Sequence, residues 1–125
     1  MDSFQASFIN EATELLVDLE AALLNLEGDT TNKQLIGEIF RVMHTLKGTA
    51  SMFGFENIGE ITHHLENIYD QIRSDKLEIT TPIFDVTLEA LDHIRYLLEH
   101  PQFDGEDGKN LSLIHISEPT RLGMI

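Results

Sequence analysis

Apolar residues recur at steps of three and four in four successive stretches of this chain. Because an α-helix turns once in 3.6 residues, this spacing places the apolar side chains of each stretch on one face of a helix. The predicted helices cover about residues 3–27, 32–53, 57–75 and 81–100. Strand patterns and internal repeats are absent from the sequence. We therefore predict an all-α fold, an antiparallel up-and-down four-helix bundle that buries all four apolar stripes.

Residues that favour helix ends separate the four stretches. Thr31 begins a capping-box pattern before the second helix, and Asn57 begins another before the third. Thr81 precedes Pro82, which predicts a cap followed by proline at the first helical position. Gly54 is expected to end the second helix.

The composition limits the classes of partner. The net charge is −14, so phosphate backbones and anionic lipids would repel the chain, and neither nucleic acid nor a membrane is an expected partner. Proteins with basic patches fit better, although the same acidity also serves solubility. The chain has no cysteine and no apolar run near the ~20 residues that span a bilayer. Its start lacks a basic, apolar leader, so we expect a cytoplasmic location.

The C-terminal part differs from the rest. Pro101 is expected to end the bundle, which gives a domain over residues 1–101. Residues 102–110 contain two glycines and three acids and are interpreted as a linker. Residues 111–125 lose the helical period, and we interpret them as vector- or adapter-derived sequence. The alternative is a native segment that docks on the bundle or on a partner.

One segment of the second helix combines groups suited to chemistry. His44 falls at the polar edge of the apolar face, with Lys47 one turn on and Ser51 nearly two. An imidazole is a nucleophile near neutral pH, and an ammonium beside it can hold an anion. Gly48 leaves a gap next to both groups, so Gly48 and Ser51 are candidate docking positions for a partner.

The third helix provides a second set of polar side chains. If the second and third helices are antiparallel neighbours, Glu66 can face His44 and accept the Nδ1 proton, which leaves Nε2 as the nucleophile. His63 lies on the same stripe but could equally be an ordinary surface residue. A functional role is favoured for Lys47 and Glu66, with a solvated surface residue as the alternative for each. With Glu66 at a surface position, Glu66→Ala should slow the chemistry at a cost in stability of about 0.5 kcal/mol or less.

The residues of this region resemble a known family. The run FRVMHTLKGTASMFGF over residues 40–55, followed by HHLEN over residues 63–67, resembles a histidine-phosphotransfer (HPt) domain. It is similar in particular to the N-terminal phosphotransfer domain of CheA-type chemotaxis kinases. The resemblance implies that His44 is the phosphorylated histidine, with Lys47, His63 and Glu66 as the polar residues around it. That family has a fifth helix, which residues 111–125 do not resemble, so we expect the fifth helix to be absent.

The resemblance also implies a function. His44 would accept a phosphoryl group from the ATP-binding domain of a histidine kinase and pass it to an aspartate of a response-regulator receiver domain. The sequence contains no Walker loop or kinase glycine loop, so we expect this domain to bind no cofactor. ATP on the kinase domain and Mg²⁺ on the regulator would come from the partners. This stretch would be a phosphocarrier, and the parent chain a protein-histidine kinase.

Other interpretations stay open at this point. The domain could belong to a hybrid sensor kinase or be a stand-alone shuttle. Glu60 and His63 have the Glu-x-x-His spacing of di-iron bundles, but a second such motif is missing, and we expect no metal site. A purely structural helical adaptor would leave residues 44–48 unexplained.

Overall fold

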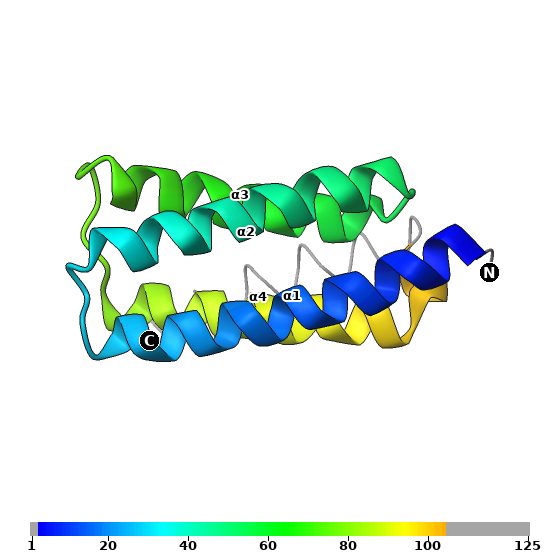
Figure 1. The fold of residues 1–125 in the computed structure, drawn as a ribbon, viewed down its shortest axis with the longest axis horizontal. Helices are drawn as coiled ribbons and strands as arrows, with labels where there is room; N and C mark the ends of the chain where they lie inside the picture. Colours follow the sequence, from blue (N-terminus) through cyan, green and yellow to red (C-terminus); the bar gives the residue numbers. More distant parts are fainter. Residues whose placement is uncertain (1–2, 105–125) are drawn as a thin grey trace.

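The computed structural model describes residues 3–104. It contains four α-helices and one 3₁₀-helix: α1 (Ser3–Glu27), α2 (Lys33–Met52), α3 (Glu56–Arg73), α4 (Thr81–Glu99) and η1 (Pro101–Phe103). No strand occurs in this part of the chain. Figure 1 shows α2 and α3 side by side in one layer and α1 and α4 in the other, with successive helices antiparallel. The predicted all-α, up-and-down four-helix bundle is confirmed.

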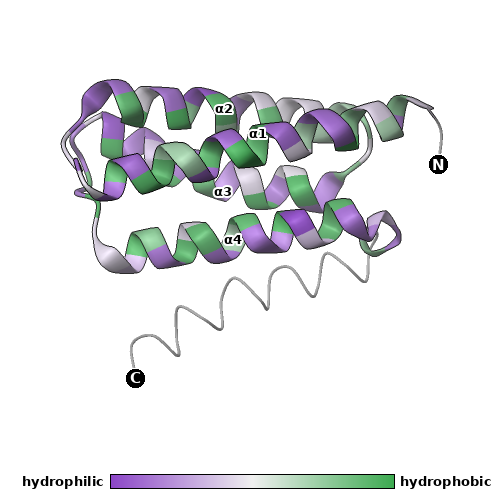
Figure 2. Cartoon of the chain, turned by 60° about the horizontal axis from the view of Figure 1, so that its bottom comes forward, coloured by the Kyte–Doolittle hydropathy of each residue, from purple (hydrophilic) through white to green (hydrophobic). Residues whose placement is uncertain are grey.

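Each helix contacts the helix before and after it, and α4 also contacts α1, so the four form a closed ring. Figure 2 shows hydrophilic and hydrophobic bands alternating along each helix, as expected of helices with one buried face. The largest fully buried side chains come from all four helices: Phe8, Leu16, Leu19, Leu23, Leu26, Ile39, Met43, Leu46, Ile58, Ile61, Tyr69 and Leu91. Burial of these apolar stripes stabilises the bundle and fixes how the helices face one another.

Two apolar residues of types that are usually buried, Met52 and Phe4, are exposed. Met52 has 78% of its surface exposed, because it follows the buried Ala50 by two positions and therefore points about 200° away from it. Phe4 is 71% exposed. It lies in the first turn of α1, which extends past the α2–α3 corner (Figure 1). The other two aromatics of this corner, Phe53 and Phe55, stack on Phe8 as a packing cluster.

Two helix caps lie one residue from their predicted positions. Asn32, not Thr31, caps α2, and its side chain accepts a hydrogen bond from the backbone N–H of Leu35. Thr80, not Thr81, caps α4. Asn and Thr are both good N-cap residues, so neighbouring candidates are hard to separate from sequence alone. Gly54 has a φ of 84°, in the left-handed region, and follows the end of α2 as expected.

The start of α3 is capped from the other end of the chain. The predicted capping box at Asn57 is wrong, because Asn57 lies inside the helix and no capping side chain comes from the residue before it. Instead, the carboxylate of Asp104 accepts hydrogen bonds from the backbone N–H groups of Asn57 and Ile58, at 2.9 and 3.1 Å. This contact holds Asp104, the residue that follows η1, against α3.

The described structure reaches three residues beyond the expected boundary at residue 101. The first part of the predicted linker, residues 102–104, packs on the bundle through η1 and Asp104. The rest of the linker and the suspected vector-derived tail, residues 111–125, lie outside the described residues. The expectation that the fifth helix is absent falls there too.

Candidate functional site

His44 lies at the border between the core and solvent on α2. Met43 and Leu46, its neighbours along the helix, are fully buried, whereas 64% of the His44 side chain is exposed. Its Nδ1 is hydrogen-bonded to Oε2 of Glu66 on α3. A carboxylate can only accept, so Nδ1 carries the proton and the lone pair of the neutral ring lies on Nε2. The predicted contact between Glu66 and the imidazole is present.

Glu66 has two cationic or protonated partners. Besides His44, Nζ of Lys47 donates to its Oε1 at 2.8 Å. Burial by itself would raise the pKa of Glu66, but the hydrogen bonds from Lys47 and His44, together with their charges, lower it below its usual value. The carboxylate therefore stays ionised near neutral pH and can accept from both partners at once.

The assignment of Glu66 to the protein surface is wrong. Glu66 is only 7% exposed, because its stripe of α3 packs against α2. On the same stripe, Thr62 is fully buried and donates to the carbonyl oxygen of Ile58. The expected cost of about 0.5 kcal/mol for Glu66→Ala assumed a solvated side chain and no longer applies.

A glycine on α3 allows the two helices to approach closely. A Cβ on Gly59 would lie 2.8 Å from Oγ of Ser51, closer than side chains tolerate without a shift. Ser51, expected as a docking position, is exposed but also lies in this helix contact. Gly48, the other expected docking position, is exposed, and a Cβ there would meet no atom within 4 Å. The surface one turn from His44 is therefore open.

His63 is not joined to this group of side chains. It is exposed, and its ring lies next to that of His64, with ring centroids 6.4 Å apart. Within residues 3–104, no hydrogen bond or ion pair links His63 to His44, Lys47 or Glu66. The structure thus brings together three of the expected site residues and leaves His63 apart.

Two neighbours of the imidazole were not predicted from the sequence. Phe40 is half-buried, although the helical period places it on the apolar face of α2, and its ring is nearly parallel to that of His44, at 6.2 Å between centroids. The guanidinium of Arg73 lies 4.0 Å from the centre of the Phe40 ring. The i, i+4 spacing of Phe40 and His44 could have revealed the first contact. Arg73 comes from α3, so its contact depends on how the two helices pack.

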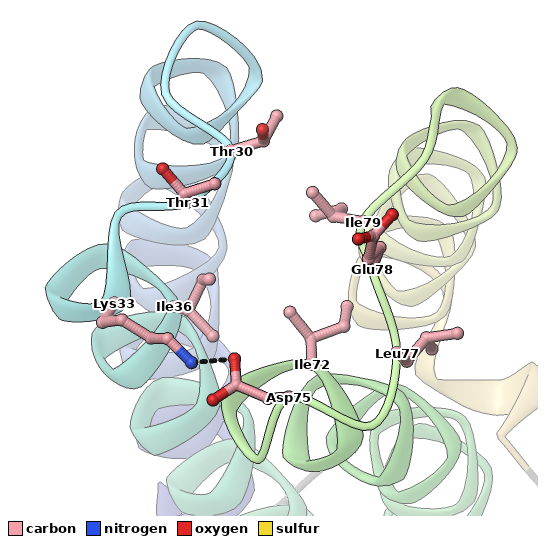
Figure 3. Close-up of a pocket in the computed structure, with 9 residues that line it drawn as sticks. All are labelled: Thr30, Thr31, Lys33, Ile36, Ile72, Asp75, Leu77, Glu78 and Ile79. Atoms are coloured by element: carbon pink, nitrogen blue, oxygen red, sulfur yellow. Dashed lines mark hydrogen bonds and ion pairs between the residues drawn. The ribbon is translucent and has the colours of Figure 1, made fainter.

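A hollow of about 320 Å³ lies at the end of the bundle formed by the α1–α2 and α3–α4 loops (Figure 3). It is lined by Thr30, Thr31, Lys33, Ile36, Ile72, Asp75, Leu77, Glu78 and Ile79. An ion pair between Lys33 and Asp75 joins α2 to the turn after α3 at one side of it. None of the His44 group lines this hollow, so the exposed imidazole lies away from it.

Two further features concern only the part of the chain that the structure describes. No three His, Asp or Glu side chains in it gather in a way that could hold a metal ion. None of the helices there combines the length and apolar character needed to cross a bilayer.

Comparisons with known proteins agree with this geometry. The model of the Hpt domain family matches residues 3–99. Chemotaxis protein CheA of Bacillus subtilis is 40% identical over 109 residues, which are 87% of this chain and 16% of that protein. The chain thus spans less than a fifth of the length of the curated relatives it matches.

Solved structures show the same fold. The CheA phosphotransferase domain from Thermotoga maritima is 33% identical, with a TM-score of 0.76, over 80% of this chain and 97% of that one. The phosphorylated P1 domain of CheA3 from R. sphaeroides, solved in complex with CheY6, has a TM-score of 0.78 over 97% of this chain and 98% of that one. At 23% identity, the second likeness concerns the fold alone.

Proposed function

This chain belongs to the Hpt domain family, and from that premise we propose that it carries a phosphoryl group on Nε2 of His44 between a histidine kinase and a response regulator. The observation that supports this most directly is the state of the ring. Nδ1 is held by an ionised carboxylate, and the other nitrogen belongs to a side chain that is 64% exposed. A ring held in one tautomer offers its lone pair to solvent, where a partner can reach it.

The proposed transfer is a substitution at phosphorus. The lone pair of Nε2 forms an N–P bond with the γ-phosphoryl group of ATP, the bond from phosphorus to the bridging oxygen breaks, and ADP leaves. The proton stays on Nδ1, and the positive charge that develops on the ring is balanced by Glu66. In the second transfer, a carboxylate oxygen of the regulator attacks phosphorus and the N–P electron pair returns to Nε2.

Lys47 and the open surface at Gly48 have supporting roles in this proposal. Lys47 is 27% exposed, so its ammonium can orient Glu66 and still add positive charge near an incoming phosphoryl group. Gly48 lets a partner surface approach the ring, and Ser51 lies further along the same helix as a second docking position. His63 would act only from the periphery of the site.

The remaining components would come from partners. We expect ATP on a kinase ATP-binding domain and Mg²⁺ on a response-regulator receiver domain, with no cofactor bound by this bundle. The likeness to CheA favours a CheA-type parent kinase over a hybrid kinase or a stand-alone shuttle. A domain of this fold from R. sphaeroides was solved with CheY6, which is in keeping with a receiver-domain partner. We propose that this chain acts in the cytoplasm.

Phosphate uptake tests the proposal. The chain is incubated with an active CheA kinase core that lacks its own phosphotransfer domain, together with labelled ATP. We expect a label that acid removes and base does not, as a phosphoramidate requires, and an unlabelled receiver domain should then take it up. His44→Gln should abolish the label, while the matched variant His64→Gln, at another exposed histidine, should retain it. Acid-labile label on His44→Gln would show that the assignment is wrong.

A further inference from the structure

Two side chains contact the imidazole of His44: the carboxylate of Glu66 and the ring of Phe40. Glu66 fixes Nδ1 at one edge of the ring. On the same helix as His44, Phe40 lies one turn earlier with its ring at 19° to the imidazole plane and 6.2 Å from it between centroids. This offset, nearly parallel arrangement is among those that aromatic pairs prefer.

Phe40 is in turn fixed by α3. The Arg73 guanidinium lies over the Phe40 ring at 4.0 Å, and Nε of Arg73 donates to a carboxylate oxygen of Asp70 at 2.8 Å. A guanidinium at this distance from a ring is attracted by its π-electrons. Glu66, Asp70 and Arg73 are spaced at i, i+4 and i+7, so one face of α3 supplies both supports.

Both supports are needed to define the direction of Nε2. A hydrogen bond at Nδ1 sets one edge of the ring, but the ring can still rock about that bond, since 64% of the side chain is exposed. A stacked neighbour restricts this rocking because it fixes the plane of the imidazole. In-line phosphoryl transfer depends on the direction of the attacking lone pair, so restricting the plane favours the reactive geometry.

We propose that Phe40, held by Arg73, is a positioning residue that fixes the plane of the His44 imidazole for phosphoryl transfer. This inference rests on the proposed function, and it adds a second support to the contact made by Glu66. Phe40 touches neither ATP nor the receiver aspartate in this scheme and acts only through His44.

Two measurements on Phe40→Leu test the inference. The first is the order of the His44 ring, from ¹³C relaxation of its side chain by NMR in the free, unphosphorylated chain. The second is the steady-state phosphorylation by the kinase core. We expect lower ring order and a kcat about 2- to 10-fold lower, the range that loss of an aromatic pair implies, with KM unchanged. Phe40→Tyr keeps the ring and should keep both values. Arg73→Met should give a smaller effect of the same kind.

Phe53→Leu is the matched control. Phe53 is also half-buried and also stacks on an aromatic ring, that of Phe8, but at the α2–α3 corner. It should leave the order of the His44 ring and kcat unchanged. An equal fall in kcat for Phe53→Leu, unchanged ring order in Phe40→Leu, or a change in KM alone would each overturn the inference. The ring-order measurement needs no kinase, so a failure of the proposed function would appear separately, as absent phosphorylation of a chain with an ordered ring.

Discussion

Two carboxylates of this bundle expose almost the same small fraction of their surface, and their pKa values are shifted in opposite directions. Glu66 is 7% exposed and Asp104 is 8% exposed, and each accepts two hydrogen bonds. The pKa of Glu66 is lowered, because the hydrogen bonds and charges of Lys47 and His44 outweigh burial. Burial raises the pKa of Asp104 to about 6, although the backbone N–H groups of Asn57 and Ile58 act against it. Glu56 adds repulsion there.

The two carboxylates differ in their partners and also in the amount of protein packed around them, which is greater at Asp104. Glu66 meets an ammonium and an imidazole, whereas Asp104 meets neutral amides and the like charge of Glu56. A charged partner compensates for the loss of water around a carboxylate far better than a neutral amide does. A carboxylate with charged partners stays ionised and can hold the tautomer of a histidine. The carboxylate of Asp104 caps α3 and stabilises the fold, and its raised pKa makes that contribution depend on pH.

Substitutions of Glu66 and of Asp104 should differ most in their effect on the rate of phosphorylation. Glu66→Ala removes the acceptor of the His44 Nδ1 proton and the partner of Lys47, so phosphorylation should slow about 10- to 100-fold, as expected for loss of hydrogen bonds to a charged group. Stability should fall by about 1–3 kcal/mol. Initial rates with labelled ATP and chemical unfolding measure the two effects.

Asp104→Ala is the matched control for this experiment. It should lower stability by about 1 kcal/mol through loss of the α3 cap and leave the phosphorylation rate within about twofold of the original. The ¹⁵N shifts of the imidazole should show the Nδ1–H tautomer of His44 becoming less populated in Glu66→Ala only. Equal slowing in both variants would mean that the rate follows the stability of α3 and that the proposed hydrogen bond has no special role.

A smaller effect is expected in the pH dependence of stability. The folded pKa of Asp104, about 6, is raised above the usual 3.8, so between pH 4 and 6 the native state binds more protons than the unfolded chain. This contribution is fully present below about pH 4 and is lost as pH rises through 6. Relative to Asp104→Asn, which does not titrate, the chain should lose about 1–2 kcal/mol between pH 4 and 7, after allowance for solvent screening.

Glu66→Gln should show the opposite trend. Because the pKa of Glu66 is lowered, its contribution is present above its unfolded value of about 4.5 and is lost as pH falls below it. Urea unfolding of the three chains at several pH values measures both differences. If the original chain instead gained stability relative to Asp104→Asn as pH rises, the two amides would stabilise the carboxylate more than burial destabilises it. The contrast with Glu66 would then disappear.

The sequence predicted one of these carboxylates and missed the role of the other for a physical reason. Glu66 lies on a helix with a regular period, so its face and its neighbour His44 follow from helical geometry once α2 and α3 are adjacent. Asp104 lies in a glycine-rich, acidic segment with the composition of a linker. Its partners, the N–H groups of Asn57 and Ile58, are backbone groups nearly fifty residues away. Because every residue except proline has a backbone N–H, the sequence does not indicate which of these groups a distant carboxylate will meet.

The other predictions also succeeded where the helical period determines the feature and failed where the feature depends on how two helices pack. Four apolar stripes with short connections were enough to predict the bundle. The depth of Glu66 was not predictable, because a polar stripe beside an apolar face is buried only where the neighbouring helix comes close, as it does at Gly59. The contact between Phe40 and Arg73 likewise joins two helices and depends on their relative height.

The smallest expected effect comes from the C-terminal end. Residues 111–125 depart from the helical period, and Asp104 already anchors the described part of the chain to α3. A chain ending at Asn110 should therefore keep its helical circular dichroism, its melting temperature and its phosphate uptake. A chain ending at Phe103 loses the carboxylate that caps α3, so it should melt at a lower temperature while still accepting phosphate. These two truncations separate the contribution of Asp104 from that of the residues that follow it.

A lower melting temperature for the chain ending at Asn110 would show that residues 111–125 stabilise the bundle and are not foreign sequence. Loss of uptake at unchanged stability would point instead to a role in recognising the kinase, and the contrast between Glu66 and Asp104 would then no longer account for all of the proposed function.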